Sequence, residues 1–286
     1  MAYLDKTQGE HFIPELWAEP IYKFLFANMK LRNSVDDYSS LVKNAGDTIH
    51  IPKIPMESTS DKSASTAVTF SSSAATKVDL TIDKHKYKAT IFEDIATIQS
   101  NFELISKYTR MYGESLARKV EDDMWLELDG FTTTRSMATA NIMIAGDLEN
   151  LLSDLYQNDI DPNDCSMALN YNLTADMLNP DSGISKYFVR ADASGEGQGL
   201  RTGAVGLIYG MNVFYSRTIG SGTSSGNVNG AVYRSDACAF AAQQDVRVQA
   251  QYDVEYLGTK VVADMIYGIK LIDESGHVLG LNITAP

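Results

Sequence analysis

The sequence predicts an α+β fold in which a long two-stranded segment precedes one very long helix, and a mixed α/β region follows. Three observations support this prediction. Apolar and polar residues alternate in residues 46–93, which is the two-residue period of half-buried strands. Apolar residues recur every three to four positions in residues 101–129, which is the helical period. Shorter helical and alternating stretches then succeed one another, and strand-like alternation closes the chain.

Composition places the chain among ordinary globular proteins of one large domain or two smaller ones. It has 286 residues, of which 44% are hydrophobic and 21% charged, and a formal net charge of −13. Proteins that grip DNA through its phosphates normally carry a basic patch, because released counterions supply the affinity. No apolar run approaches the ~20 residues that cross a bilayer, and Met1–Glu10 lacks a signal pattern. We therefore expect no tight DNA binding, no membrane insertion and no export.

The first segment of the chain predicts two short helices. Pro14 suits a first helical turn, whereas Pro20 interrupts the pattern, so we expect a turn of helix, a kink and a second helix to about Leu31. The apolar residues at near-helical spacing are Ile13, Leu16, Trp17, Ile21, Phe24, Leu25 and Met29. This apolar surface either packs on the chain's own core or reaches a neighbouring subunit.

Residues 46–93 predict a long two-stranded arm with a polar tip. Ile49 and Ile51 share one face of a strand, which Pro52 and Pro55 either end or confine to an edge. Residues 56–76 are mostly Ser, Thr, Ala and Asp. Alternation resumes at residue 77 and slips by one position after Asp83, which favours a β-bulge or a strong twist. Since two strands alone are only marginally stable in water, the arm implies a partner surface.

The long helix is the strongest single prediction. Ser100 and Glu103 have the spacing of a capping box, and residues 101–129 would span about 43 Å. Gly130 stands where a helix often ends on a left-handed residue.

The rest of the chain predicts several short elements, with loops rich in Gly near residues 191–203 and 220–230. The expected elements are a helix over residues 147–158, a strand over 166–169, a helix over 173–178, strands over 204–209 and 211–216, a small-residue helix around 235–244, closing strands over 246–272 and a turn at 273–276.

Motifs for catalysis or cofactor binding are missing from the sequence. Cys165 and Cys238 are too few and too far apart for a zinc cluster or a disulfide framework, and we expect ordinary thiols. The spacing of Gly195-x-Gly-x-Gly199 is wrong for a dinucleotide loop and favours a flexible turn. The scattered histidines form no His-Glu-x-x-His zinc helix. We therefore expect no catalytic, cofactor-binding or metal-binding residues, and no enzyme.

Two charged runs leave alternatives open. Glu121-Asp122-Asp123 could be a metal site, but adjacent helical residues point in different directions, which favours a solvated face. Lys84, Lys86 and Lys88 alternate along a strand and project from one face. They could contact nucleic acid, but docking against an acidic neighbour suits a chain of charge −13 better.

The order of the expected elements resembles the major capsid proteins of tailed phages, the Hong Kong 97 type fold. Several local stretches resemble that family as well, and together they span essentially the whole chain. These stretches are Phe12-Ile-Pro-Glu-Leu-Trp-Ala-Glu-Pro20, Gly46-Asp-Thr-Ile-His-Ile-Pro52, Gly206-Leu-Ile-Tyr-Gly-Met-Asn-Val-Phe-Tyr-Ser216 and Ala263-Asp-Met-Ile-Tyr-Gly-Ile-Lys270. The resemblance rests on their order and spacing.

The resemblance implies a division of the chain into parts. Residues 1–45 would be an N-terminal arm, and 46–93 an extended β-loop over an adjacent subunit. Residues 94–135 and 246–286 would form a peripheral domain with the spine helix 101–129. Residues 136–245 would form an axial domain around the centres of hexamers and pentamers.

The function that the resemblance implies is a major capsid protein that self-assembles as hexamers and pentamers into an icosahedral head around double-stranded DNA. Further implied partners are a separate scaffolding protein, a portal protein and, as an additional candidate, a decoration protein, with weak non-specific contact to DNA and no membrane. The implied location is the virion capsid, assembled in the host bacterial cytoplasm. The alternatives are a cellular encapsulin-type shell around a cargo enzyme and an enzyme of an unrelated α/β class.

Overall fold

The computed structural model describes residues 29–42, 47–53, 59, 61–68, 76–94, 103–138, 142–178, 188–190, 204–219, 228–272 and 280–284. Several of the sequence predictions fall wholly or mostly outside these residues. They are the two N-terminal helices before residue 29, the cap at Ser100, the Gly-rich loops near 191–203 and 220–230 with the Gly195–Gly199 turn, and the turn at 273–276.

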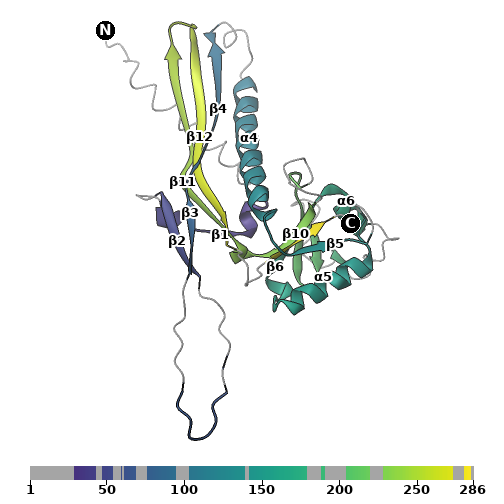
Figure 1. Cartoon of the computed structure of the whole chain (residues 1–286). Coiled ribbons are helices and arrows are strands. Elements are labelled where there is room, and N and C mark those ends of the chain that lie inside the picture. The colour runs from purple at the N-terminus through teal and green to yellow at the C-terminus, as the bar shows by residue number, and fades with distance from the viewer. Residues whose placement is uncertain are drawn as a thin grey trace.

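The first structural unit is a four-stranded sheet with the long helix α4 (Glu103–Leu128) along it (Figure 1). The sheet has the order β1-β11-β12-β4. Its strands are β1 (Asp36–Asp37), β11 (Cys238–Asp253), β12 (Gly258–Leu271) and β4 (Lys84–Glu93). The residues of α4 that are fully or almost fully buried recur at helical spacing, namely Tyr112, Leu116, Ala117, Val120, Met124, Trp125 and Leu128. The predicted long helix is confirmed, because one apolar stripe covers the sheet.

The helix ends differently from the prediction at Gly130. Positive φ occurs only at Gly206 and Gly210 among the glycines that the structure describes, so Gly130 is not left-handed. Its N–H instead donates to the Glu127 carbonyl at 3.0 Å, and the Phe131 N–H donates to the Leu128 carbonyl at 3.4 Å. These hydrogen bonds join residues three positions apart, as in a 3-10 turn. They satisfy carbonyls of the last helical turn and tighten the end of the helix.

The second unit is a seven-stranded sheet with helices packed on it. Its order is β5-β13-β10-β6-β9-β8-β7. The strands are β5 (Thr134–Ser136), β13 (Gly280–Thr284), β10 (Val228–Arg234), β6 (Cys165–Leu169), β9 (Met211–Tyr215), β8 (Ala204–Ile208) and β7 (Phe188–Arg190). The helices are α5 (Ala145–Gln157) and α6 (Tyr171–Leu178), with 3-10 turns η3 (Pro162–Asp164) and η6 (Ser235–Ala237). The short elements predicted between residues 147 and 216 are confirmed, with Gly210 at φ +89° between β8 and β9.

The helix predicted around residues 235–244 is wrong. Apart from the three-residue turn η6, this stretch belongs to β11, which pairs antiparallel with β12 from Cys238↔Leu271 onward. Its alanines have high helix propensity. Pairing of β11 with β1 on one side and with β12 on the other overrides this propensity. The small side chains also let α4 approach closely, since the Cys238 Sγ lies 3.6 Å from the Met124 Sδ.

The two-stranded arm is shorter than the prediction over residues 46–93. Only β2 (Thr48–Lys53) and β3 (Thr76–Thr81) pair with each other. The strand β4 instead pairs antiparallel with β12 along its whole length. The phase slip after Asp83 therefore marks the passage from one sheet to another, not a bulge within one strand. The Ile82 N–H donates to the Asp47 carbonyl at 2.8 Å and closes the arm at this point.

The strand pairing at the chain ends also crosses the predicted divisions. β1, within the predicted N-terminal arm, pairs parallel with β11. β13, predicted to return to the first sheet, pairs with β10 and β5 in the second. The physical reason is burial: Leu281 and Ile283 enter the second core beside Val232. The two sheets are thus tied together by segments from distant parts of the chain. None of the described helices is long and apolar enough to cross a membrane.

A glycine where β12 passes β3 offers a test of this arrangement. A Cβ on Gly268 would lie 2.3 Å from the Thr81 carbonyl oxygen. We expect Gly268→Ala to lower the free energy of unfolding by about 1–3 kcal/mol, the usual cost of overpacking. Urea denaturation of unassembled subunits measures this change. Gly146→Ala is the matched control, because a Cβ there meets nothing within 4 Å, and its stability should be unchanged or slightly higher. Equal stability of the two variants would contradict the close approach of β3 to β12.

Candidate interaction surfaces

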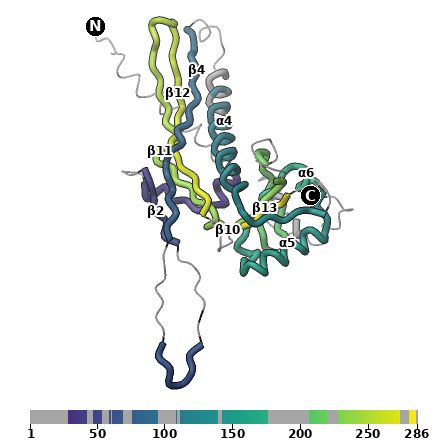
Figure 2. Tube along the Cα trace, in the orientation of Figure 1, coloured from purple at the N-terminus to yellow at the C-terminus, as the bar shows by residue number. Residues whose placement is uncertain are grey.

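The arm formed by β2 and β3 is anchored at its base and exposed at its far end. Val78 and Leu80 are buried in the core of the first unit, and the Lys53 ammonium donates to the Ile272 carbonyl at 3.2 Å. Residues 61–68, in contrast, are all exposed and lie well away from both sheets (Figure 2). This part of the arm buries nothing within its own chain, as the sequence predicted, and is available to a partner.

The tip of the β11–β12 hairpin is a second exposed surface. Val254, Tyr256 and Leu257 are 75%, 58% and 62% exposed. Leu257 also has φ +44°, a backbone conformation that is uncommon for a residue other than glycine. Large apolar side chains grouped at the end of a long hairpin are characteristic of a contact surface.

The interpretation of Glu121-Asp122-Asp123 as a solvated face is wrong. Glu121 and Asp123 are each only 6% exposed, and Asp122 is half-buried. The Glu121 carboxylate accepts the Leu31 N–H at 2.9 Å and the Arg32 N–H at 3.5 Å, so it holds residues 31–32 against α4. Burial raises the pKa of Glu121 to about 7, and the backbone N–H groups of Arg32, Leu31 and Lys30 oppose this rise. Sequence spacing alone did not reveal that two faces of α4 are covered.

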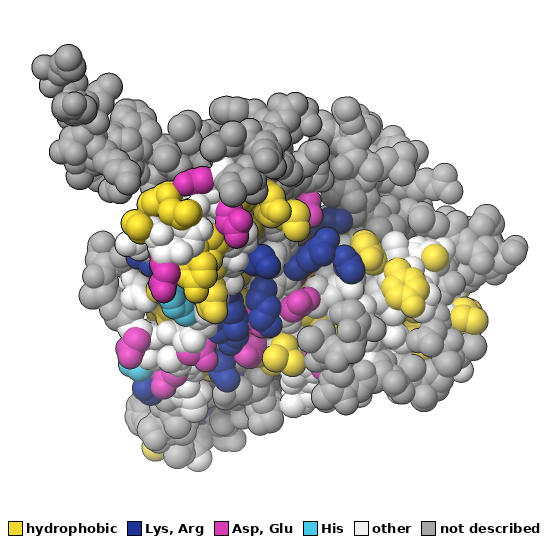
Figure 3. All heavy atoms as spheres, turned by 90° about the horizontal axis from the view of Figure 1, so that it is seen from above, with side chains coloured by type: hydrophobic (Ala, Val, Ile, Leu, Met, Phe, Trp, Pro, Cys, Tyr) yellow, Lys and Arg dark blue, Asp and Glu magenta, His cyan; other side chains and the backbone are white. Residues whose placement is uncertain are grey.

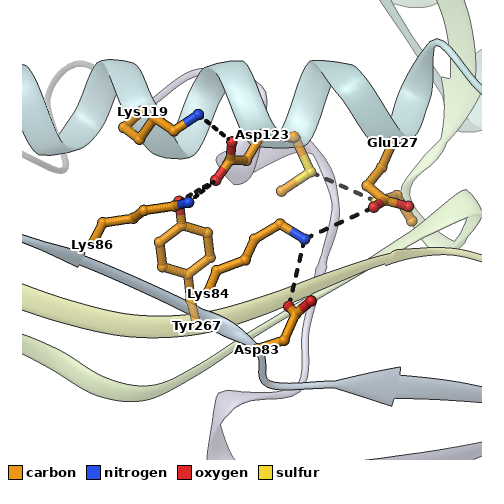
Figure 4. Close-up of polar contacts among 9 residues, drawn as sticks. Asp83, Lys84, Lys86, Lys119, Asp123, Glu127 and Tyr267 are labelled. Carbon is orange, nitrogen blue, oxygen red and sulfur yellow. Dashed lines mark hydrogen bonds and ion pairs between the residues drawn. The ribbon is translucent and has the colours of Figure 1, made fainter.

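Asp123 joins α4 to the sheet beneath it (Figure 4). It accepts hydrogen bonds from the Lys119 ammonium at 2.6 Å and the Tyr267 hydroxyl at 2.8 Å, and the Lys86 ammonium lies 3.6 Å away. Burial raises the pKa of Asp123, but the bonds from Lys119 and Tyr267 and the charges of Lys119 and Lys86 outweigh it. The pKa of this carboxyl therefore lies below its ordinary value.

The predicted acidic neighbour of the lysine run is in part the chain's own long helix. Besides the Lys86–Asp123 pair, Lys84 lies 3.9 Å from Glu127 and 3.6 Å from Asp83 (Figure 4). Lys88 remains exposed at the surface. Two of the three lysines thus stabilise the packing of β4 on α4, and one is directed to solvent.

Both cysteines are free thiols in buried positions, as the sequence predicted. Burial raises the pKa of Cys165 to about 12, and it also raises the pKa of Cys238. A thiol that stays protonated at neutral pH is a poor nucleophile and a poor metal ligand. In the described part of the chain no three His, Cys, Asp or Glu side chains are grouped so that they could hold a metal ion.

Two grooves run along the flanks of α4. The first, of 460 Å³, lies between α4 and the end of β9 and is lined by Lys30, Glu114, Arg118, Glu121, Asp122, Tyr215, Ser216, Arg217 and Thr218. The second, of 570 Å³, lies between α4 and β4 and is lined by His85, Lys86, Tyr87, Lys88, Met111, Glu114, Ser115, Leu116, Arg118, Lys119 and Asp122. Arg118 faces both grooves. Positive side chains gather on this side of the molecule, as Figure 3 shows from above.

A long helix on a largely antiparallel sheet, an arm that projects from it and a second α/β unit beside it define the class of the protein: it has the Hong Kong 97 type capsid fold. The comparisons with solved structures carry this assignment. A chain from Mycobacterium phage Che8 is 21% identical and superposes with a TM-score of 0.67, covering 89% of this chain and 90% of the other.

Two further structures match almost as well. A chain from the capsid of cyanophage P-SCSP1u is 16% identical, with a TM-score of 0.62 over 85% of this chain and 84% of the other. A chain from a virus-like particle of Pyrococcus furiosus is 11% identical, with a TM-score of 0.61 over 94% of this chain and 98% of the other. No protein-family model and no curated protein matches the sequence. The likeness therefore lies in the fold.

Glu121 predicts a pH dependence of stability. Its pKa is about 7 in the folded chain against 4.5 for an ordinary Glu, so the folded state binds more protons between these values. Its contribution is fully present below pH 4.5 and is lost as pH rises through 7, by about 3 kcal/mol in all. Glu121→Gln keeps an acceptor for the Leu31 N–H and should remove this loss.

Urea denaturation of unassembled subunits between pH 4.5 and 8 measures the effect as the difference between wild type and variant. Asp122→Asn, at the neighbouring half-buried position, serves as the matched control and should keep the wild-type slope. If the difference between wild type and Glu121→Gln did not change with pH, Glu121 would not be desolvated as described.

Proposed function

We propose that this chain is the major capsid protein of a tailed phage, which self-assembles as hexamers and pentamers into an icosahedral head around double-stranded DNA. The observation that carries the proposal is the extent of the structural match. The superpositions cover nearly the whole of this chain and of the phage chains compared with it. The residues outside the superpositions are too few to form a further domain of their own.

The parts of the chain receive roles under this proposal. The chain before β1 forms an arm along neighbouring subunits, and β2, β3 and the segment between them supply the extended loop. The first sheet with α4 forms the peripheral domain, and the second sheet with α5 and α6 forms the axial domain at the capsomer centre, so that β4 belongs to the peripheral domain and β5 and β13 belong to the axial domain. Two features support the role of the loop. Its paired base is anchored on Gly268 and Lys53, and residues 61–68 are exposed beyond it.

Further partners follow from the same proposal. A separate scaffolding protein, a portal protein and a decoration protein would act with the subunit during assembly in the host bacterial cytoplasm, and the mature location is the virion capsid. The net charge of −13 suits a shell that encloses DNA with only weak, non-specific contact, since tight binding requires many phosphate contacts. The role is structural and not enzymatic.

Electron microscopy of the expressed protein, with its scaffold present, tests the proposal directly. We expect closed icosahedral shells made of hexamers and pentamers. Soluble monomers under every condition would overturn it. Purified shells that contain a cargo enzyme and no DNA would instead favour a cellular encapsulating shell.

Shortening the arm should separate folding from assembly. Replacing residues 56–75 by a short Gly/Ser linker keeps both paired strands, so the subunit should fold with an unchanged midpoint of urea denaturation. The yield of closed shells should fall roughly tenfold or more, since a loss of about 1.4 kcal/mol per contact already changes an equilibrium tenfold. Light scattering and electron microscopy measure the yield.

A variant with residues 61–68 in shuffled order keeps the length and composition of the arm. This variant distinguishes two effects on shell yield: the length of the arm, which it keeps, and the specific contacts of residues 61–68, which it removes. Normal shell yield and thermal stability in the shortened variant would show that the arm does not join subunits.

A further inference from the structure

A strip of positive charge follows both flanks of α4. It consists of the side chains of Lys30, Lys86, Lys88, Arg118, Lys119 and Arg217, which line the two grooves. Arg118 and Lys119 are 62% and 46% exposed in their side chains, and Lys88 and Arg217 are exposed as well. We call this surface the basic strip; Figure 3 shows Lys and Arg side chains in dark blue, gathered on one side of the molecule.

The internal contacts of the basic strip neutralise it only in part. Lys86 and Lys119 share the single buried carboxylate of Asp123. Arg118 lies 3.9 Å from Glu114, which at that distance and exposure contributes little. The charge that remains is notable in a chain whose formal net charge is −13. A localised positive surface on an acidic protein selects an acidic partner.

The complementary surface lies on the same chain. Between Arg135 and Lys186 the sequence contains Asp and Glu but neither Lys nor Arg. In the structure this stretch forms α5 and the η3 turn after it, where Glu149, Asp159, Asp161 and Asp164 are exposed. Exposed apolar side chains accompany them, with Tyr156 61% exposed and Ile144 39% exposed. We call this surface the acidic lobe.

The elements that carry the basic strip and the acidic lobe lie on different sides of the seven-stranded sheet in one subunit (Figure 1). In Figure 1, α5 lies below the seven-stranded sheet, whereas the middle of α4 stands above it. Figure 3, seen from above, shows Lys and Arg side chains gathered on that upper side. A contact between two different surfaces of identical subunits is head-to-tail, and it closes into a ring when the rotation between neighbours permits.

We propose that the acidic lobe of one subunit docks on the basic strip of the next, so that the two surfaces form the lateral contact of a ring of subunits. The inference rests on the proposed function and names the side chains that would join its subunits. Opposite charges on the two surfaces orient the approaching subunits. Contacts between two acidic lobes or between two basic strips are disfavoured, because like charges would then face each other. Tyr156 and Ile144 supply apolar area at the centre of the contact.

A second copy fits the basic strip better than nucleic acid does. Glu114 and Asp122 lie among its cations, and such carboxylates would repel a phosphate backbone. An acidic lobe made of separate side chains can avoid them and still pair with the exposed cations. The chain itself also supplies the matching surface at equal copy number.

A charge-swap experiment tests the contact. The strip variant carries Arg118→Glu and Arg217→Glu, and the lobe variant carries Glu149→Lys and Asp164→Lys. We expect each variant alone to fold normally by urea denaturation but to form oligomers about tenfold less than wild type or worse at about 0.1 M salt, because like charges now face each other. Mixing the two variants should restore oligomers, since a reversed strip then meets a reversed lobe. Analytical ultracentrifugation measures all oligomers, and electron microscopy measures closed shells.

The control is Lys270→Glu, an exposed β12 residue that lines neither groove, and it should assemble as wild type does. Normal oligomers from both variants alone would overturn the inference while leaving the proposed function intact. A mixture that fails to restore oligomers would also overturn it. Strip variants that assemble normally but retain less DNA would assign the strip to nucleic acid and overturn the docking contact. A further outcome is that each variant alone loses oligomers and the mixture recovers them, while the wild-type protein forms oligomers that never close into shells. This outcome would support the contact and count against the capsid function.

Discussion

The packing of α4 on β12 and β4 is the interaction on which the rest of the structure depends. Trp125, Met124 and Leu128 are fully buried in this contact, and burying one such side chain stabilises a fold by about 1.5–3 kcal/mol. Asp123 fixes the position of the helix by accepting from Lys119 and from Tyr267 of the sheet. Glu121, on another face of the same helix, holds residues 31–32. One helix thereby connects the start of the chain, the strand β4 and the C-terminal hairpin.

A rigid centre of this kind explains why the surfaces for neighbours lie where they do. The arm leaves the sheet beside Gly268, where only a glycine allows β3 to pass so closely. The hairpin of β11 and β12 extends to an exposed apolar tip. The cations of the basic strip are presented by α4, β4 and the turn after β9. Because each surface is mounted on the same core, a change in the packing of α4 would shift all of them together.

The buried carboxylates show how local patterns mislead when an element is covered on several sides. Glu121-Asp122-Asp123 has the spacing of a solvated helical face, yet two of the three are buried. Their partners, the Leu31 N–H and the Tyr267 hydroxyl, are 90 and 144 residues away in the chain. No local signal identifies such partners. The strand from Cys238 is a similar case, because its alanines favour a helix and only pairing with β12 makes them a strand.

The sequence by itself determined the elements whose periodicity comes from one buried face. The stripe on α4, the alternation in β2, β3 and β12 and the amphipathic pattern of α5 are all visible in it, since each reflects a local geometry of 3.6 or 2 residues per repeat. Only the tertiary structure decided which strands pair, where the arm ends and that β13 closes the second sheet. It also decided that α5 and the middle of α4 lie on different sides of the second sheet (Figure 1). These features depend on contacts between residues far apart in the chain, and a local pattern does not contain them.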